Sequence, residues 1–597
     1  MTHTPAPLRT AVTVAVLLIA ACSRWSPTAA DLSPADGKRV EGRHGMVASS
    51  HPDASAAGIE ILRAGGNAAD AAVAIGFALS VTDISQTGLG GGGALTFYDA
   101  RAGKAEHLSF YPRTGRDPAW AVADTGPVAS RPAGRAAGVP GMVAGLLETQ
   151  RRFGRLTRAQ VMAPAIRLAR DGFVVSPLLS RTITASRARL EADTAARATF
   201  FHDGAPLGPG DRLVQPRLAA TLERIAQDGP DGFYKGDVAA RLAQDVRSRG
   251  GLITTDDLAR YTVAAMIPLC AEWRGFTVLS APPPMGGSAV LEMLQLAEAS
   301  GLTKLGGYTD RPAAVTAMAG VLRTAQADAG RWRGDPFTVA VPARGVSSAS
   351  YAIERAREAT GPARDSITFG NAWAHDSSAL PAHCAAYPYA SAVRPPTATD
   401  TPKGPDAVEA ERPASSDENT SFTSHLSVVD AEGNAVSATT TVGVLFGSGV
   451  YSGGFFLNSS AANFDARTRG TERYSNSTMA PTMILDGRDV RLVIGAAGSQ
   501  YIQPAITQVT VRILAYGEDP GRAITAPRIQ TSPGRLEVEV EPGFSTDVYA
   551  ALVAAGYRPV SRIADITFGG VHGIYVRRDG KRIGIADPRR DGVARRQ

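Results

Sequence analysis

Metal-ligand clusters are the first thing that this sequence lacks. It holds 3 cysteines and 9 histidines, and neither Cys270 nor Cys384 stands with a histidine at a zinc-ligand spacing. A zinc site is therefore excluded, and no metal site is predicted. The glycine run 88–93 is not followed by Lys-Ser or Lys-Thr, which makes it a weak phosphate loop. No flavin or nucleotide signature is present either, so we expect chemistry that needs no cofactor.

Aromatic residues are also few, at 6%, which leaves no obvious platform for stacking nucleic-acid bases. The net charge of +6 is spread along the chain apart from arginine pairs near the C-terminus, and no recognisable nucleic-acid-binding module accompanies it. We interpret those pairs as a solvated tail and predict no nucleic-acid partner. The 597 residues are 44% hydrophobic, enough for a sizeable core. Length indicates several domains, or one unit made from two interleaved segments.

The apolar run at the N-terminus is too short to cross a membrane as a mature helix. Arg9 precedes the run 11–21, which ends in Ala-Ala before Cys22. A basic start, a short apolar stretch and small residues predict a signal peptide at 1–21. The junction resembles a bacterial lipobox, which implies lipidation of Cys22 and a polar tether at 22–44. An ordinary secretion signal cut nearby is the alternative. Either one predicts export to the periplasm, with any membrane contact made through the lipid anchor.

Export changes how the two remaining cysteines are interpreted. If Cys22 carries lipid, only Cys270 and Cys384 are left, and an oxidising compartment permits them to pair. Since the sequence does not show whether they lie close together, a disulfide and two buried thiols both stay open.

The first half of the chain is mostly helical in pattern. A strand is expected at 45–49, and the glycine run 88–93, just before the next strand, indicates close backbone packing. The stretch 385–422 differs from the rest. It is rich in Ala, Pro, Ser and Thr and shows little periodicity, which predicts a flexible segment. The other expected elements are helices at 55–63, 68–81 and 313–330, a mostly helical region at 141–306, and strands at 94–98 and 274–279.

The flexible segment stops abruptly at a hairpin. Strands are predicted at 423–430 and 435–442, joined by a turn that contains Gly433-Asn434. A flexible tail that runs straight into a core hairpin is an unusual junction, and it is understandable if the chain is cut between Phe422 and Thr423.

A threonine at the start of a chain carries its own catalytic base. Its α-amine titrates near pH 7.7–8.0, so at neutral pH a useful fraction is unprotonated and can activate the hydroxyl of the same residue. Within an uncut chain that amine is an amide and cannot act as a base. Cleavage before Thr423, through attack of its hydroxyl on the preceding carbonyl, would therefore activate the protein.

Several motifs occur in the order found in one family. The stretch Thr423-Ser424-His425-Leu426-Ser427-Val428-Val429-Asp430 resembles the start of the small subunit in the gamma-glutamyltransferase family of N-terminal-nucleophile hydrolases. The resemblance implies an α/β fold, a four-layer αββα sandwich, with a large subunit at 45–422 and a small subunit at 423–597. Other matching segments are 65–72, 90–93, 138–141, 169–172, 233–236, 250–253, 282–287, 334–336, 477–482, 526–528 and 586–589.

The resemblance also implies roles for individual residues. Thr423 would be the nucleophile in self-cleavage and in turnover, and Thr441 would assist processing and hold the new amine. Gly498 and Ser499 match the glycine pair whose amides form the oxyanion hole. Because Ser499 replaces a glycine, that donor survives only if the backbone suits a residue with a Cβ. Two hydroxyls that would bind the substrate carboxylate are those of Ser477 and Thr478.

The substrate clamp departs from the family pattern. Tyr111 stands where an arginine is expected, although a small gap would bring Arg113 into that position. Gly443 replaces an asparagine, while Ser460 and Asn463 replace a Gln or Glu and an Asp. Loss of a charge that opposes a buried ammonium costs on the order of 2–5 kcal/mol, which weakens gamma-glutamyl recognition. The stretch 465–476, where many members carry a lid, is also short, so we expect a more open site.

Three functions follow from these observations. The first is hydrolysis or transfer of gamma-glutamyl groups, with glutathione as the family's usual donor. The second is an acylase for glutaryl-like or other acyl amides that lack the α-amino group. The third is a noncatalytic, peptide-binding lipoprotein that runs as one uncut chain. The partners expected for an enzyme are a small-molecule or peptide amide and the other subunit from the same precursor.

Overall fold

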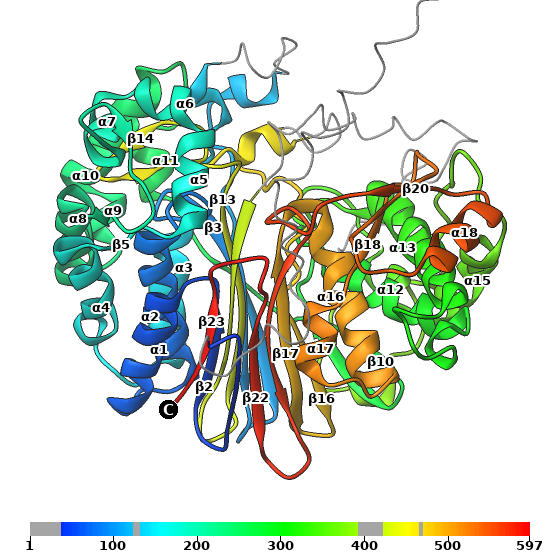
Figure 1. The fold of residues 1–597 in the computed structure, drawn as a ribbon. Coiled ribbons are helices and arrows are strands. Elements are labelled where there is room, and N and C mark those ends of the chain that lie inside the picture. The colour runs from blue at the N-terminus through cyan, green and yellow to red at the C-terminus, as the bar shows by residue number, and fades with distance from the viewer. Residues whose placement is uncertain (1–36, 123–131, 392–421, 465–469) are drawn as a thin grey trace, which may run out of the picture.

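Two large sheets packed face to face form the centre of the molecule (Figure 1). The computed structural model describes residues 37–122, 132–391, 422–464 and 470–597. Each sheet has seven strands, and all neighbouring strands in both are antiparallel. The β17 sheet has the order β1 (Arg39–Gly42), β22 (Arg582–Ala586), β21 (Gly570–Val576), β17 (Asp489–Ala497), β16 (Thr482–Asp486), β11 (Phe276–Ser280), β10 (Leu269–Trp273). The β12 sheet has the order β23 (Val593–Arg596), β2 (Met46–Ser49), β12 (Phe422–Val429), β13 (Ala435–Gly443), β3 (Gly92–Asp99), β4 (Lys104–Phe110), β9 (Ala264–Met266).

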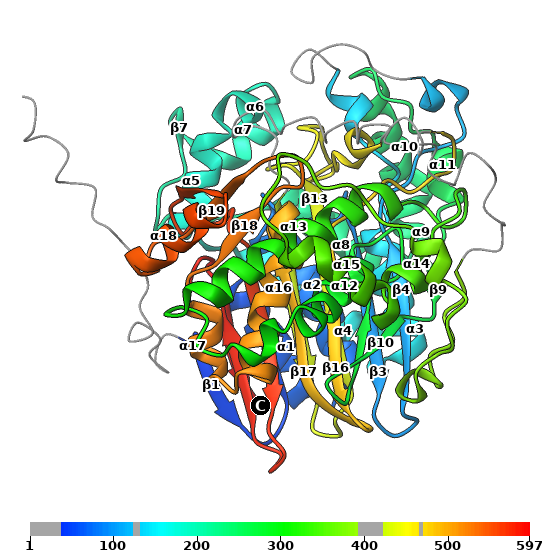
Figure 2. The same cartoon turned by 90° about the vertical axis from the view of Figure 1, so that its right-hand side faces the viewer.

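Helices cover the outer face of each sheet, which gives the order helices, sheet, sheet, helices in Figure 1. On the β12 sheet lie α1 (Pro52–Arg63), α2 (Ala68–Thr82) and α3 (Met142–Phe153), with α4 (Arg158–Asp171), α8 (Pro216–Asp228) and α10 (Gly236–Arg247) beyond them. On the β17 sheet lie α12 (Gly287–Ala299), α16 (Ile502–Thr510) and α17 (Pro520–Thr525), with α13 (Pro312–Trp332), α15 (Ala349–Thr360) and α18 (Thr546–Ala554) beyond them, and Figure 2 looks onto these helices.

Shorter elements connect these layers. Near the first helical layer they are α5 (Pro177–Ala185), α6 (Arg187–Glu191), α7 (Thr194–Phe200), α9 (Asp231–Tyr234) and α11 (Thr255–Ala259). Elsewhere they include α14 (Ala343–Val346) and a small sheet of β18 (Ile529–Thr531), β19 (Glu537–Val540) and β20 (Arg558–Ser561).

Helix α2 shows why the first layer packs so closely. Asn67 caps its first turn, and Asp70 returns the bond in a reciprocal capping box. Every residue from Ala68 to Thr82 is buried, as expected for a helix that is apolar nearly all round. The glycine run ends in β3, where a Cβ on Gly91 would lie 2.2 Å from the Thr441 carbonyl oxygen. The glycines therefore serve backbone packing, as the sequence indicated.

Strands from distant parts of the chain lie side by side. β12 and β13 occupy the middle of their sheet, with β2 on one side and β3 on the other. In the other sheet β16 pairs with β11 from the first part of the chain. Residues 37–391 and 422–597 therefore share both sheets and one sandwich, which agrees with the single unit of interleaved segments.

Several boundaries differ from the sequence-based expectations. The region 141–306 contains β9 and β10 in addition to helices, and the strand expected at 274–279 begins at Phe276. Arg274 has a φ of +54° and Gly275 one of +80°, so these residues form the turn between β10 and β11. The flexible segment expected at 385–422 lies mostly outside the described residues. Its described ends are ordered, because Tyr387 and Tyr389 are buried and Phe422 begins β12.

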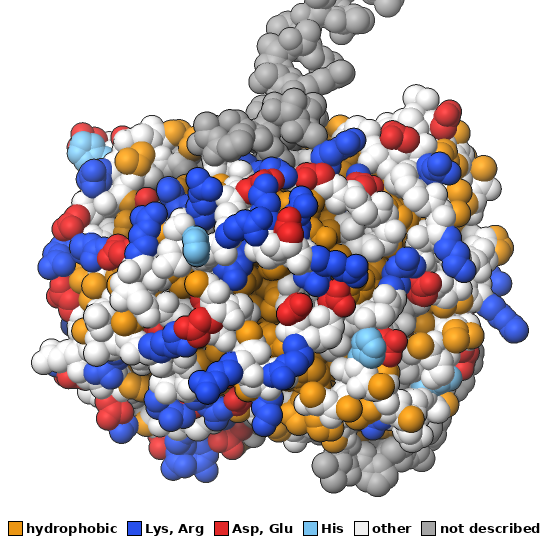
Figure 3. Space-filling view, turned by 90° about the horizontal axis from the view of Figure 1, so that it is seen from below, with side chains coloured by type: hydrophobic (Ala, Val, Ile, Leu, Met, Phe, Trp, Pro, Cys, Tyr) orange, Lys and Arg blue, Asp and Glu red, His pale blue; other side chains and the backbone are white. Residues whose placement is uncertain are grey.

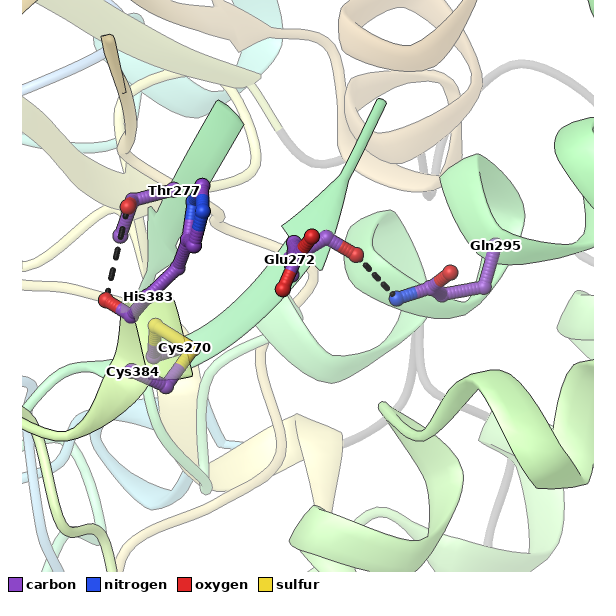
Figure 4. The surroundings of a disulfide bond; sticks show 6 residues. All are labelled: Cys270, Glu272, Thr277, Gln295, His383 and Cys384. Atoms are coloured by element: carbon purple, nitrogen blue, oxygen red, sulfur yellow. Dashed lines mark hydrogen bonds between the residues drawn. A yellow bond between two sulfur atoms is a disulfide. The ribbon is translucent and has the colours of Figure 1, made fainter. Parts of the chain in front are cut away.

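The two cysteines form a disulfide, which settles the alternative that the sequence left open. Cys270 on β10 bonds to Cys384, with Cα atoms 5.6 Å apart (Figure 4). Next to it the Thr277 hydroxyl donates to the His383 carbonyl at 3.4 Å. The disulfide therefore ties the end of residues 37–391 to the edge of the β17 sheet.

The surface and the helices bear on two further expectations. Figure 3 shows Lys and Arg side chains distributed over one face with Asp and Glu among them, in agreement with a charge that is spread along the chain. Over the described ranges, no helix combines the length and apolar character needed to span a bilayer. The signal peptide expected at 1–21 and Cys22 lie outside the described residues.

Candidate functional site

Thr423 lies near the start of β12, in the middle of the sandwich. Its side chain is buried, with 3% exposed. Successive side chains of a strand point to opposite faces, so Thr423 shares a face with His425 and Ser427. The Ser427 hydroxyl donates to the His572 carbonyl at 3.2 Å, which shows that this face looks toward the β17 sheet. Thr423 therefore points into the space between the two sheets.

The packing of β12 on β17 shows what Thr423 approaches. Ser427 lies within 3.5 Å of the Val493 carbonyl, and the His425 ring fills the space beside Gly495. Two residues closer to the start of β12, the contact between the strands therefore lies two residues closer to the end of β17. The next step brings Thr423 level with Ala497, at the edge of the turn that contains Gly498 and Ser499.

Thr441 contacts the carbonyl of the bond that precedes Thr423. Its hydroxyl donates to the Phe422 carbonyl oxygen at 2.5 Å and accepts from the Gly443 amide at 2.7 Å. The β12–β13 register shifts here, because Phe422 pairs with Gly443 while Ser424 pairs with Thr440. Two residues of β13 therefore oppose Thr423 alone, and this bulge directs the Thr441 hydroxyl at the carbonyl.

Gly498 and Ser499 form the turn after β17, and both have positive φ. Gly498 has a φ of +127°, and a Cβ there would lie 2.9 Å from the Gly569 Cα, so this position requires glycine. Ser499 has a φ of +52°, in the left-handed region that a serine adopts at a cost. The β17–β21 ladder ends at Ala497 paired with Gly570, and the turn bond runs from Tyr501 to the Gly498 carbonyl. Neither this last ladder pair nor this turn hydrogen bond involves the backbone amide of Gly498 or of Ser499.

Ser477 and Thr478 lie at the same end of the β17 sheet. They precede β16, whose first residue, Thr482, pairs with Ile494 near the end of β17. The Ser477 amide donates to the Pro284 carbonyl at 3.1 Å, which fixes the segment against the turn before α12. Their role in binding a substrate carboxylate stays a prediction.

Asn458 holds the loop that carries Ser460 and Asn463. Its amide nitrogen donates to the carbonyls of Gly90 and Gly138, each at 2.8 Å, and its oxygen accepts from the Ser460 amide at 3.1 Å. Ser460 is 1% exposed, and its hydroxyl has no hydrogen-bond partner among the described residues. A buried, unpaired hydroxyl in a well-anchored loop is available to a ligand.

Tyr111, and not Arg113, contacts Asn463. The Asn463 amide nitrogen donates to the Tyr111 hydroxyl at 3.4 Å. The Arg113 guanidinium lies 5.3 Å from the centre of the Tyr261 ring and donates to the Arg260 carbonyl at 2.6 Å. At the position where the family has an arginine, this chain therefore presents the phenol of Tyr111 to Asn463. The Arg113 guanidinium bonds elsewhere, so the small gap that would align Arg113 with the family's arginine does not bring it to Asn463.

Gly443 shows how the loop and the hairpin fit together. Its φ is +93°, and a Cβ there would lie 2.1 Å from the Ser459 hydroxyl oxygen. The same hydroxyl accepts from the Val444 amide at 3.1 Å. An asparagine therefore does not fit at Gly443 unless Ser459 moves, and the sequence alone gave no signal for this pairing.

The histidine nearest to Thr423 is not a base for it. The His425 ring bonds to the Thr439 hydroxyl at 2.8 Å and to the Ser427 hydroxyl at 3.1 Å. Burial holds the pKa of His425 well below its usual value, so the ring is neutral. In the part of the chain that the structure describes, no group of three or more His, Cys, Asp and Glu side chains could hold a metal ion.

Comparisons with known proteins agree on one relationship. A family model described as Gamma-glutamyltranspeptidase matches residues 54–596. The Glutathione hydrolase proenzyme of Escherichia coli (strain K12) is 33% identical, over 97% of each chain. The Acylase ACY 1 proenzyme of Pseudomonas sp. (strain SE83) is also 33% identical, over 95% of this chain and 96% of its own. The crystal structure of cephalosporin acylase from Bacillus halodurans superposes with a TM-score of 0.77 at 25% identity, covering 93% of this chain and 96% of the other.

Proposed function

This chain belongs to the gamma-glutamyltranspeptidase family of hydrolases, and we propose that it cuts itself between Phe422 and Thr423 to become an N-terminal threonine amidohydrolase or transferase. Residues 45–422 would form the large subunit and 423–597 the small one. The proenzyme relatives support a precursor. The two pieces would stay together, because β12 and β13 pair on both sides with strands of the large subunit.

Self-cleavage would begin with the Thr423 hydroxyl. Its oxygen attacks the Phe422 carbonyl carbon, and negative charge develops on the carbonyl oxygen that accepts the Thr441 hydroxyl. The bond to the Thr423 nitrogen then breaks, the nitrogen takes a proton, and an ester to Thr423 remains. Water hydrolyses that ester, which frees the Phe422 carboxylate, the Thr423 hydroxyl and a terminal amine.

Turnover would reuse the same hydroxyl with the new amine as its base. Attack on a substrate amide forms an acyl ester on Thr423 and releases the amine portion of the substrate. The amides of Gly498 and Ser499 are proposed to stabilise the oxyanion, which their position at the end of β17 supports. Water or an amine then accepts the acyl group, giving hydrolysis or transfer.

The observation that carries the proposal is the bond from the Thr441 hydroxyl to the Phe422 carbonyl. Replacing Thr441 by valine keeps the shape and removes the donor, so we expect self-cleavage to slow by roughly 100-fold. Thr441→Ser should retain most of the rate. Ser437→Ala is the matched control, since it removes a hydroxyl bond from the same strand to the Ile494 carbonyl but leaves the carbonyl contact of Thr441 in place.

The measurement is the appearance of two bands from the 62.1 kDa chain on a denaturing gel. Unchanged cleavage in Thr441→Val would contradict the role of Thr441. A wild-type protein that stays as one band would instead favour the noncatalytic peptide-binding alternative.

Two classes of acyl donor are candidates. Gamma-glutamyl compounds, glutathione among them, follow from the family and from the glutathione hydrolase relative. Acyl amides without an α-ammonium, such as glutaryl amides, are favoured by the neutral pair of Tyr111 and Asn463. Because residue 463 is an asparagine and not a carboxylate, binding of a substrate α-ammonium is weaker by about 2–5 kcal/mol. This lowers the preference for gamma-glutamyl over glutaryl compounds by roughly 30-fold or more. The acylase relative supports this second candidate.

Turnover of a gamma-glutamyl anilide and a glutaryl anilide separates the two. A higher kcat/KM for the glutaryl compound assigns the acylase function, and a roughly 30-fold preference for the glutamyl compound assigns the first. Asn463→Asp should shift the ratio toward the glutamyl compound by about tenfold or more, because it places a carboxylate opposite the ammonium. Glutaryl turnover in the same variant is the internal control and should not rise.

We further propose export and lipid attachment at Cys22. The support is the signal-like sequence before Cys22 and the Cys270–Cys384 disulfide, which is typical of an oxidising compartment such as the periplasm. Cys22→Ala should move the protein from the membrane fraction to the soluble fraction. A wild-type protein that is already soluble would contradict the anchor and leave an ordinary secretion signal.

A further inference from the structure

One buried acid near the nucleophile has no part in the proposed mechanism. Asp83 follows the last turn of α2 and is 7% exposed. One carboxylate oxygen accepts from the Gln86 side-chain amide at 2.7 Å. The other accepts a short hydrogen bond from the hydroxyl of Ser424, the residue directly after Thr423. Two donors therefore converge on a single carboxylate behind the start of β12.

The segment after Asp83 also holds the neighbouring strand. The Gln86 carbonyl accepts from the Val442 amide at 3.0 Å, next to Thr441. The Thr87 hydroxyl donates to the Thr440 hydroxyl at 2.9 Å. Ser424 lies opposite Thr440 in the hairpin, so residues 83–87 hold both β12 and β13 directly beside the bond proposed to be cut.

Few charges surround the Asp83 carboxyl. Arg590 donates to the Gln86 side-chain oxygen, and its positive charge favours the carboxylate, while the negative charge of Asp591 opposes it. From β12 the Ser424 hydroxyl faces it. Burial outweighs these contributions and raises the pKa of Asp83 to about 7.

We propose that Asp83 is a positioning residue for the bond that Thr423 breaks, a role that rests on the proposed self-cleavage. By accepting from Ser424 and Gln86 together, the carboxylate fixes the start of β12, so that the Thr423 hydroxyl and the Phe422 carbonyl keep their alignment with Thr441. Ser424 lies on the opposite face of the strand from Thr423, so Asp83 acts through Ser424 and not on the reacting atoms.

The two protonation states of Asp83 differ in this role. A carboxylate accepts from both donors, whereas a protonated carboxyl donates through one oxygen, which leaves Ser424 or Gln86 without its acceptor. Self-cleavage should therefore be fast above about pH 7 and slow below it. The precursor has no free Thr423 amine, so its pH dependence in this range does not come from that group.

The test follows self-cleavage of the full-length chain, made by pulse-labelled oxidising cell-free synthesis and chased between pH 5.5 and 8.5. The wild-type rate should rise with a single-proton midpoint near pH 7. Asp83→Asn satisfies only one of the two donors, so at pH 8 it should cleave roughly tenfold more slowly, with no midpoint between pH 6 and 8.

Two serine variants form a matched pair. Ser424→Ala removes the hydroxyl through which Asp83 acts on β12, so at pH 8 it should cleave roughly tenfold more slowly and lose the midpoint near pH 7. Ser176→Ala removes a hydroxyl that donates to another buried carboxyl, that of Asp591, and should keep the wild-type rate and profile.

The outcomes are distinguishable. If the wild type is not cut before Thr423, the proposed function fails. If it is cut and Asp83→Asn keeps the wild-type rate and midpoint, the positioning role is overturned. If Asp83→Asn loses its cooperative thermal transition, the wild-type profile and Ser424→Ala decide. A wild type without a midpoint, or a Ser424→Ala variant that keeps the wild-type rate and midpoint, overturns the role.

Discussion

Two adjacent residues at the end of β17 adopt positive φ angles, and only one of them is glycine. Gly498 has no room for a Cβ, whereas Ser499 has one and adopts a φ of +52°. A non-glycine residue in the left-handed region costs on the order of 1 kcal/mol, and such strain is often found at functional sites. The sequence raised the question of whether a serine is compatible with this turn, and the backbone accommodates it at that cost.

Replacing Ser499 by glycine should relieve this strain. We expect Ser499→Gly to raise the free energy of unfolding by about 1 kcal/mol, while the backbone amide of residue 499 is retained. Gly498→Ala should do the opposite, because its Cβ would lie 2.9 Å from the Gly569 Cα. Urea denaturation of both variants measures this. Destabilisation by Ser499→Gly would show that its side chain makes a compensating contact.

Three helices of the second layer enclose a pair of acids. Asp328 on α13 accepts from the Arg355 guanidinium and from the Tyr351 hydroxyl, both on α15, each at 2.8 Å. Glu292 on α12 is fully buried beside them, and neither of its carboxyl oxygens has a hydrogen-bond partner among the described residues. Burial, together with the charge of Asp328, raises the pKa of Glu292 well above its usual value.

This raised pKa makes the stability of the helical layer depend on pH. An unfolded Glu ionises near pH 4.3 while folded Glu292 keeps its proton, so the folded state binds more protons above that pH. The contribution of Glu292 is therefore complete below about pH 4.3 and is lost as the pH rises toward the folded pKa.

In Glu292→Gln the side chain at position 292 is neutral at every pH. The variant should therefore lose the part of the pH dependence of the free energy of unfolding that Glu292 contributes. The check is the free energy of unfolding from urea titrations between pH 4 and 7. Glu358→Gln, also on α15, is the control and should keep the wild-type pH dependence. An unchanged slope in Glu292→Gln would mean that Glu292 is ionised in the folded protein.

The sequence predicted elements well where one pattern was long, as in α2 and the β12–β13 hairpin. It failed for β9 and β10, which have 3 and 5 residues and lie within a helical stretch, because short strands carry little periodicity. Within the site, the family order of motifs predicted roles for Thr423 and Thr441, and the structure places the Thr441 hydroxyl on the Phe422 carbonyl. Asp83 was missed, since a single acid after an apolar helix resembles a cap, and its partner Ser424 lies 341 residues away.

At the scale of the whole molecule, the cut would fall inside a continuous sandwich. The strands on both sides of β12 and β13 come from before the proposed cut, so separating the two pieces would break two ladders in the middle of a sheet. The disulfide makes a different connection. Cys270 and Cys384 both precede Phe422, so it closes a loop within the large subunit and does not join the two subunits.

The position of the disulfide predicts its behaviour on gels and in melts. Two bands should appear with or without reductant, because no disulfide crosses the cut. Closing a loop of 114 residues restricts the unfolded chain, and the double variant Cys270→Ser, Cys384→Ser should lose roughly 4 kcal/mol of stability. A single band without reductant, or an unchanged melting temperature in the double variant, would contradict this assignment.

The central claim is most directly tested by N-terminal sequencing of the smaller piece of the purified, active protein. We expect it to begin Thr-Ser-His-Leu, from Thr423 onward, and we expect Thr423→Ala to remain a single chain. Active protein with an intact bond between Phe422 and Thr423, or a small piece that begins at another residue, would contradict the account.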